Sequence, residues 1–217
     1  VEGVSALELI QQIGILGMLS PDKVVQIALD LCEALRFAEQ NRIVHRNISP
    51  SNILIRRTDG TTLLNDLILA RGIDTSNAAR LTTPGEVLGD VRHMSPEQLG
   101  SGHLLDHRSD IYQLGVTLYV LLAGRPPFEG GTVTNTITQV LTVTPESTRS
   151  RNISIPDQLD TVVLRMLARN PRDRYQSAEE LAVALKRVER ETSQFLLRSN
   201  DANPRATGWK GALDGLL

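Results

Sequence analysis

His45-Arg46-Asn47-Ile48-Ser49-Pro50-Ser51-Asn52-Ile53-Leu54-Ile55 is the part of the sequence that says most about the fold of this chain. It joins a polar loop, with Pro50 near its centre, to a short run rich in isoleucine. Such a run favours a strand, here from Asn52 to Ile55. Thr58-Asp59-Gly60 then predicts a turn and Thr62-Leu63-Leu64 a second strand, so the loop leads into a small β-hairpin.

Helices are predicted on both sides of this hairpin. Ser20-Pro21-Asp22 combines an N-cap hydroxyl, a proline at the first helical position and an acid near the positive end of the helix dipole. The helix that begins there is expected to run to about Gln40. Residues 110–123 are apolar on nearly every face, which indicates a central helix surrounded by others. Three more helices are expected at about 133–143, 157–168 and 178–192.

Composition and charge exclude several classes of protein. With 217 residues and 41% hydrophobic side chains, the chain is long enough for one globular domain or one large lobe of a bigger domain. A net charge of -2 gives no reason to expect nucleic acid or an anionic membrane as a partner. The longest apolar run, 114–123, is too short for the roughly 20 residues of a membrane span. Cys32 stands alone among apolar residues, so we expect a buried thiol in a reducing compartment.

The motifs of this sequence resemble, in order and spacing, those of a Ser/Thr protein kinase of the bacterial type. The loop pattern of that family is His-Arg-Asp, then Leu-Lys-Pro, one variable position and Asn. Six segments carry the resemblance: His45–Leu54, Asp66–Arg71, Met94–Gln98, Asp106–Gly115, Gly124–Phe128 and Asn170–Tyr175. The resemblance implies a mainly α fold with a small β-hairpin, namely a protein-kinase-like C-terminal (large) lobe.

Val1-Glu2-Gly3-Val4 resembles the hinge between kinase lobes, with the first large-lobe helix over Ser5 to Ile15. The Gly-rich loop, strand lysine and helix glutamate of a small lobe would precede the hinge. We therefore expect a chain with its N-terminal lobe missing or separate: a large lobe over 1–193 and a loosely structured tail over 194–217.

Two positions of the catalytic loop depart from the family. Asn47 stands where the resemblance places the catalytic aspartate, and Ser49 where it places the phosphate-facing lysine. A neutral amide cannot take the proton of a substrate hydroxyl, and general-base steps typically contribute ~10² to 10⁴ in rate. Ser49 removes a positive charge that would stabilise the transferring phosphoryl group. The alternative for this pair is a retained polar turn with no chemistry.

Asn52 and Asp66 match the family's magnesium ligands, so Mg and ATP binding are open to this chain. In the alternative interpretation, Asn52 caps its own loop and Asp66 begins a turn. Ile68 replaces the glycine of the family's Asp-Phe-Gly segment, which would crowd the space beside the phosphates. Asp90 replaces a threonine that in the family touches the catalytic aspartate and lysine.

Five further residues are assigned to structure. His45 is expected to pack in the core under the loop, and Arg46 resembles the arginine that receives a phosphate from the activation segment. Glu97 and Arg174 are expected to form a partly buried ion pair, and Asp110 to accept backbone N–H groups of the loop. The candidate donors of the phosphate are Thr75, Ser76, Thr82 and Thr83.

Three functions stay open. The first is a pseudokinase, a kinase-like domain impaired in phosphotransfer that binds partners and nucleotide. The second is part of an active or weakly active Ser/Thr protein kinase that transfers the γ-phosphate of ATP to protein. The third is an interaction module without nucleotide, in which the surface around residues 130–155 binds a protein partner. Each is expected in the cytoplasm, or in the cytoplasmic part of a larger membrane-anchored protein.

Overall fold

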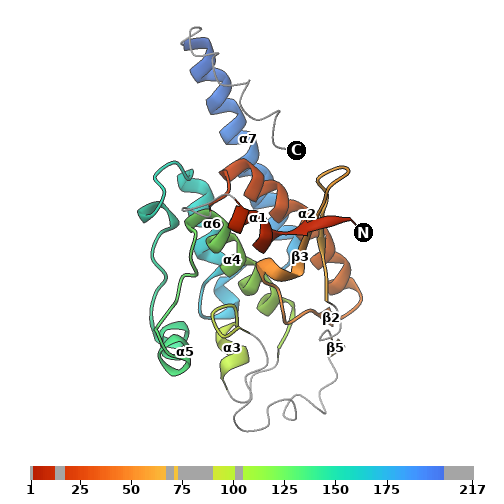
Figure 1. Ribbon diagram of the computed structural model, residues 1–217, viewed down its shortest axis with the longest axis vertical. Helices are drawn as coiled ribbons and strands as arrows, with labels where there is room; N and C mark the ends of the chain where they lie inside the picture. Colours follow the sequence, from red (N-terminus) through yellow and green to blue (C-terminus); the bar gives the residue numbers. More distant parts are fainter. Residues whose placement is uncertain (1, 13–17, 67–70, 73–89, 101–104, 203–217) are drawn as a thin grey trace.

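A computed structural model describes residues 2–12, 18–66, 71–72, 90–100 and 105–202, with the backbone alone at 71–72 and 193–202. The body is mainly helical, and a small sheet lies at the side where the chain begins (Figure 1). This agrees with the predicted fold class. Over these described ranges, no helix is long and apolar enough to cross a membrane. The helices are α1 (Ala6–Gln12), α2 (Pro21–Gln40), α3 (Pro96–Leu99), α4 (His107–Ala123), α5 (Val133–Thr142), α6 (Asp157–Met166) and α7 (Ala178–Ala202).

Helix α2 begins and ends where the sequence predicted. The Ser20 hydroxyl accepts the N–H of Lys23 at 3.4 Å and caps the first turn. At the other end the Asn41 side chain donates to the carbonyl of Phe37 at 2.8 Å. Cys32 is 2% exposed on the buried face, and desolvation raises the pKa of its thiol to about 12. The expectation that Cys32 is buried is confirmed.

Helix α4 is the centre of the core. Every residue from 109 to 123 is buried, because α2 and α6 pack on it and the loops cover the rest (Figure 1). It begins three residues before the predicted start, because the Asp106 carboxylate caps it by accepting the N–H of Arg108 at 2.9 Å. Gly115 allows the close approach of α6: a Cβ there would lie 2.7 Å from the Cβ of Met166. The predicted central helix is confirmed.

The hairpin is confirmed and has a third strand. Strands β3 (Ile53–Arg56) and β4 (Thr62–Leu64) pair antiparallel, and β1 (Gly3–Ser5) pairs with the other edge of β3. The stretch expected to be a hinge thus contributes β1, which at three residues is too short to show an alternating pattern. A second two-stranded pair joins β2 (Ile43–Val44) to β5 (Arg71–Gly72).

Helix α7 is longer than predicted. It continues to Ala202, ten residues beyond the expected end near Thr192, and projects from the end of the body opposite α3 and α5 (Figure 1). The reason is that no helix breaker occurs before Pro204. The expected tail therefore loses 194–202 to the helix, and its remainder, 203–217, lies outside the described residues.

Candidate functional site: a kinase-like catalytic loop

The backbone of the loop from His45 to Asn52 is held from below by Asp110 of α4. One carboxylate oxygen accepts the N–H of His45 and the other that of Arg46, both at 2.8 Å. Asp110 is 1% exposed. Desolvation raises the pKa of its carboxyl to about 6, although both N–H bonds oppose the rise. Asp110 thus accepts the backbone N–H groups, as expected from the sequence.

Gln113, one turn further along α4, holds the same loop. Its amide oxygen accepts the N–H of Ile48 at 3.0 Å, and its amide nitrogen donates to the carbonyl of Arg46 at 2.9 Å. Gln98 of α3 donates to that carbonyl as well, at 3.0 Å. The sequence reasoning missed both glutamines. The available signal was Gln113, a polar side chain in the middle of a helix that is apolar all round.

His45 lies under the loop and is fully buried. Its Nε2 is 3.0 Å from the carbonyl oxygen of Asn65, and its Nδ1 accepts the N–H of Asn47 at 3.4 Å. These two bonds require the proton on Nε2. Desolvation lowers the pKa of His45, which keeps the ring neutral. The imidazole therefore connects two backbone segments.

Three predicted site residues meet above the loop. The side-chain nitrogen of Asn47 donates to the Asp66 carboxylate at 3.5 Å, a long contact. The side-chain nitrogen of Asn52 donates to the carbonyl of Asn47 at 2.9 Å. The backbones of Asn52 and Asn65 are joined by a 2.8 Å hydrogen bond, which fixes Asp66 beside the loop. Asp66 itself has a positive φ of 67°, a conformation uncommon for any residue but glycine.

Ser49 is 9% exposed and has a local partner. Its hydroxyl oxygen lies 2.8 Å from that of Ser51, so the two hydroxyls share one hydrogen bond. A lysine here would project an ammonium group on a long stem. The serine pair is short, neutral and confined to its own turn, so this position places no positive charge above the loop.

The oxygen donors that remain fit a hard divalent cation. Asn52 uses its side-chain nitrogen within the loop, which leaves its amide oxygen for a ligand, and Asp66 supplies a carboxylate. No cluster of three or more His, Cys, Asp or Glu side chains occurs within the described part of the chain. Two oxygen ligands from the protein, with the remaining ligands supplied by phosphate and water, match the way magnesium is bound in phosphoryl-transfer sites.

Asp90 belongs to a local charge cluster. Its carboxylate accepts the backbone N–H of Arg92 at 3.0 Å and three guanidinium hydrogen bonds, the shortest at 2.7 Å. Arg92 also reaches Glu129 at 3.2 Å, and His93 lies 3.5 Å from Asp90. Interaction with His93, then with Arg92, holds the pKa of Asp90 well below its ordinary value. Among contacts between described residues, none joins Asp90 to Asn47 or Ser49.

Glu97 and Arg174 form the buried ion pair expected from the sequence. The guanidinium contacts both carboxylate oxygens, at 2.7 and 2.8 Å, and Arg174 is fully buried. Its other donors go to the carbonyls of Ala168, Arg169 and Arg108, so all five N–H groups are used. Desolvation would raise the pKa of Glu97, but Arg174 outweighs it and the pKa is lowered.

Several predicted positions fall outside the described residues. These are Ile68 and the four candidate phosphate donors, Thr75, Ser76, Thr82 and Thr83. The role of Arg46 as a phosphate receiver therefore stays a prediction.

A family model described as "Protein kinase domain" matches residues 1–185. The serine/threonine-protein kinase PknB of Mycobacterium tuberculosis is 38% identical over 173 residues, which cover 79% of this chain and 27% of the relative. A probable serine/threonine-protein kinase of Corynebacterium efficiens, CE0033, is 36% identical over 192 residues, covering 87% and 29%. The chain thus spans less than a third of these curated relatives.

A solved structure is similar to the fold. The crystal structure of the Mycobacterium tuberculosis PknI kinase domain, in a variant with one cysteine replaced by alanine, aligns with a TM-score of 0.65 at 24% sequence identity. The alignment covers 86% of this chain and 62% of that one. At this identity the similarity speaks for the fold alone.

Proposed function

Because this chain belongs to the protein kinase family, we propose that it is a large lobe of a Ser/Thr protein kinase in which phosphotransfer is impaired. The proposal rests on Asn47. Its amide nitrogen faces the Asp66 carboxylate at 3.5 Å. An aspartate at this position would hold a second negative oxygen beside Asp66 and would accept the proton of a substrate hydroxyl. The Asn47 amide donates a hydrogen bond at the position where a catalytic base has to accept a proton.

A second loss supports the same function. Ser49 shares a hydrogen bond with Ser51 and supplies no charge to a transferring phosphoryl group. The reactive positions have changed while the loop backbone is anchored by Asp110 and Gln113.

We further propose that Asn52 and Asp66 hold magnesium together with nucleotide phosphates. Magnesium supplies charge neutralisation between phosphate oxygens when it is bound. The Asn47 amide competes for Asp66, and Asn52 is oriented by its bond to the Asn47 carbonyl. Both asparagines therefore decide how available the site is to the metal.

A phosphotransfer assay with ATP and magnesium tests the proposal, on the chain together with a kinase small lobe. We expect no transfer above the level of an Asp66→Ala variant. Turnover that Asp66→Ala abolishes would overturn the proposed impairment. Arg187→Ala, on the exposed face of α7, is the matched control for handling and folding.

The runner-up is a slow but active kinase. Positioning and metal electrostatics supply most of phosphoryl-transfer catalysis, so a missing base need not abolish it. In that case Asn47→Asp raises turnover, and Ser49→Lys raises it further. If neither variant acquires activity in the presence of a small lobe, the loss extends beyond these two positions.

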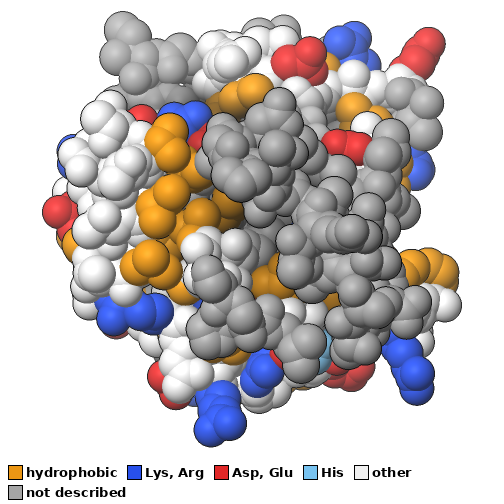
Figure 2. Space-filling view, turned by 90° about the horizontal axis from the view of Figure 1, so that it is seen from below, with side chains coloured by type: hydrophobic (Ala, Val, Ile, Leu, Met, Phe, Trp, Pro, Cys, Tyr) orange, Lys and Arg blue, Asp and Glu red, His pale blue; other side chains and the backbone are white. Residues whose placement is uncertain are grey.

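An interaction module is the third candidate, favoured by exposed apolar side chains around residues 130–155. Val133, Val143 and Ile153 are 53%, 47% and 77% exposed. Figure 2 shows hydrophobic side chains gathered in a patch on the face at the α3 and α5 end. Under this proposal, magnesium and ATP do not change the melting temperature of the chain joined to a small lobe. A rise in melting temperature with magnesium and ATP favours the impaired or the slow kinase instead.

We propose a reducing, cytoplasmic compartment for this lobe, in line with its single buried cysteine. We propose that the large lobe expected over 1–193 continues along α7 to Ala202, so that the segment following the lobe begins at residue 203.

A further inference from the structure

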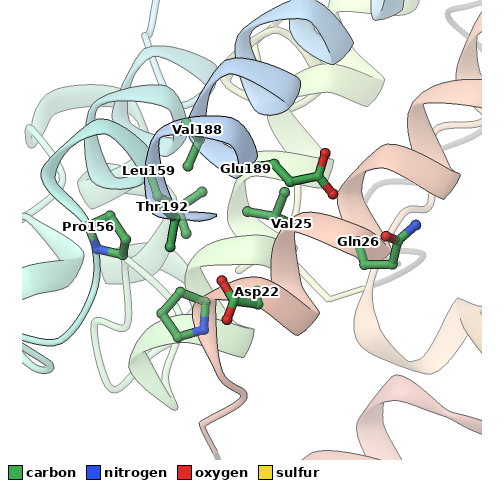
Figure 3. A pocket seen from close by; sticks show the side chains of 9 residues that line it. Asp22, Val25, Gln26, Pro156, Leu159, Val188, Glu189 and Thr192 are labelled. Atoms are coloured by element: carbon green, nitrogen blue, oxygen red, sulfur yellow. The ribbon is translucent and has the colours of Figure 1, made fainter. Parts of the chain in front are cut away.

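A pocket of about 210 Å³ lies far from the catalytic loop, where three helices meet. The first turns of α2, the start of α6 and the middle of α7 line it (Figure 3). Its floor is apolar: Val25, Leu159 and Val188 are 4%, 0% and 3% exposed. Nothing in the proposed function uses this pocket.

The rim of the pocket is acidic. Asp22 of α2 and Glu189 of α7 are both exposed and stand at its edge (Figure 3). Within the described part of the chain, neither carboxylate has a lysine or arginine nitrogen within 4 Å. The neighbouring acid on α7 differs, because Glu191 pairs with Arg187 at 2.8 Å. An apolar floor with two uncompensated carboxylates fits an apolar side chain next to a basic one.

We propose that the pocket is the docking site for the segment of this chain that follows α7, residues 203–217. Its sequence, Asn-Pro-Arg-Ala-Thr-Gly-Trp-Lys-Gly-Ala-Leu-Asp-Gly-Leu-Leu, contains the one tryptophan of the chain, Trp209, directly followed by Lys210. The indole of Trp209 covers the apolar floor, and the ammonium group of Lys210 meets Glu189 and Asp22. The pocket and the segment are thus complementary in both polarity and charge.

The length of chain allows this docking. From Thr192, at the pocket, to Ala202, the helix rises about 15 Å at ~1.5 Å per residue. The seven residues from Asn203 to Trp209 span up to roughly 23 Å when extended. Pro204 stops the helix and Gly208 permits a turn, so the chain can reverse along α7. Docking would orient whatever follows the lobe.

Fluorescence of Trp209 tests the proposal in the 217-residue chain without an added probe, because no other tryptophan contributes. We expect a blue-shifted emission and reduced acrylamide quenching relative to the free 203–217 peptide. Glu189→Lys should lower the ratio of docked to undocked segment by about two- to fivefold, the size of a rim ion pair. Lys210→Glu should do the same, and the double charge swap should restore docking.

Glu191→Lys is the matched control, since it makes the same charge change on the same helix away from the pocket. Circular dichroism and thermal unfolding verify that each variant folds. Three results would overturn the proposal: a Trp209 spectrum equal to that of the free peptide, an equal response to Glu189→Lys and Glu191→Lys, or a blue shift that depends on protein concentration. The last result would assign the contact to a second copy.

Cross-linking provides a second measurement. A chain with Glu189→Cys and Lys210→Cys should form an intrachain disulfide under mild oxidation faster than one with Glu191→Cys and Lys210→Cys. Cys32 does not compete, because it is buried. Equal rates for the two pairs would mean that the segment samples α7 without docking, which contradicts the proposal.

Discussion

The underside of the catalytic loop, which faces helix α4, and its upper side, which faces Asp66, differ in how many residues of the kinase pattern they keep. Below, Asp110 and Gln113 bind three backbone N–H groups and one carbonyl of the loop, and Arg174 uses all five of its donors. Above, Asn47 and Ser49 stand where the resemblance to the family places the residues that act on a phosphoryl group. The loop backbone is thus anchored mainly from helix α4, on the side away from Asn47 and Ser49.

The physical reason lies in solvation. A buried backbone N–H that loses its partner costs about 1–3 kcal/mol wherever it is, so the supports cannot change singly. Asn47 is only half-buried and can exchange a protein partner for water. A side chain on the upper side can therefore change at a smaller cost in stability than one of the supports, and four measurements would test this contrast.

The largest effect is expected from Arg174→Ala, on the supporting side. It leaves Glu97 buried without a counter-charge and removes the guanidinium donor from three carbonyls. Loss of one partner of a buried pair typically costs about 3–5 kcal/mol. Urea unfolding measures this, with Arg187→Ala in an exposed pair as the control, expected to leave the unfolding curve almost unchanged. Equal effects would refute the contrast.

A pH dependence is expected next. The pKa of Asp110 rises from 3.8 in the unfolded chain to about 6 in the fold, so the folded state binds the proton more tightly between these values. The contribution of Asp110 to stability therefore falls as pH rises from 3.8 to about 6 and is constant above, a change of roughly 2–3 kcal/mol. The difference in unfolding free energy between the unsubstituted chain and Asp110→Asn should show this slope. If this difference does not change with pH, the pKa of Asp110 is the same in the folded and the unfolded chain.

Gln113→Leu is expected to cost about 1–3 kcal/mol, because it leaves the buried N–H of Ile48 without an acceptor. The carbonyl of Arg46 keeps its bond from Gln98. Differential scanning calorimetry gives the value. Thr138→Val is the control, because the Thr138 hydroxyl bonds only locally, to the carbonyl of Thr134 on the exposed side of α5 at 3.0 Å. A Tm equal to that of the control variant would show that Gln113 does not stabilise the loop.

The smallest effect is expected from Asn47→Asp, on the upper side. It sets two carboxylates about 3.5 Å apart, a repulsion of about 1 kcal/mol at the dielectric constant of water. Thermal unfolding should show a slightly lower Tm that magnesium ions alone restore. Asn47→Ala, which adds no charge, should not respond to magnesium in this way. Equal responses of both variants would place the metal elsewhere or nowhere near Asp66.

Much of the fold could be predicted, for identifiable reasons. Helix α2 and strand β4 have strong local signals, a cap with proline and an apolar run between turn residues, and both have the predicted ends. Strand β1 was missed, because its three residues form a strand only through pairing with β3. The end of α7 was placed too early, since helix-forming residues continue to Ala202 without a breaker.

The candidate site divides in the same way. His45, Asp110, Glu97 and Arg174 could be placed because their spacing matches a known framework, and their contacts are present. The roles of Gln98 and Gln113 could not be placed, because a glutamine in sequence does not show which backbone group it will meet. Asp90 was noted as a change, but its contacts with Arg92 and His93 depend on how the segment turns.

The kinase-like large lobe, and the prediction that Asn47 and Ser49 stand at reactive positions, follow from the sequence alone, because residue identity fixes which groups can accept a proton or carry a charge. The packed fold was needed to show that the Asn47 amide faces Asp66, that two glutamines and a buried aspartate hold the loop, and that an acidic-rimmed pocket forms between α2, α6 and α7. These contacts join residues far apart in the chain, and their geometry exists only after the helices have packed.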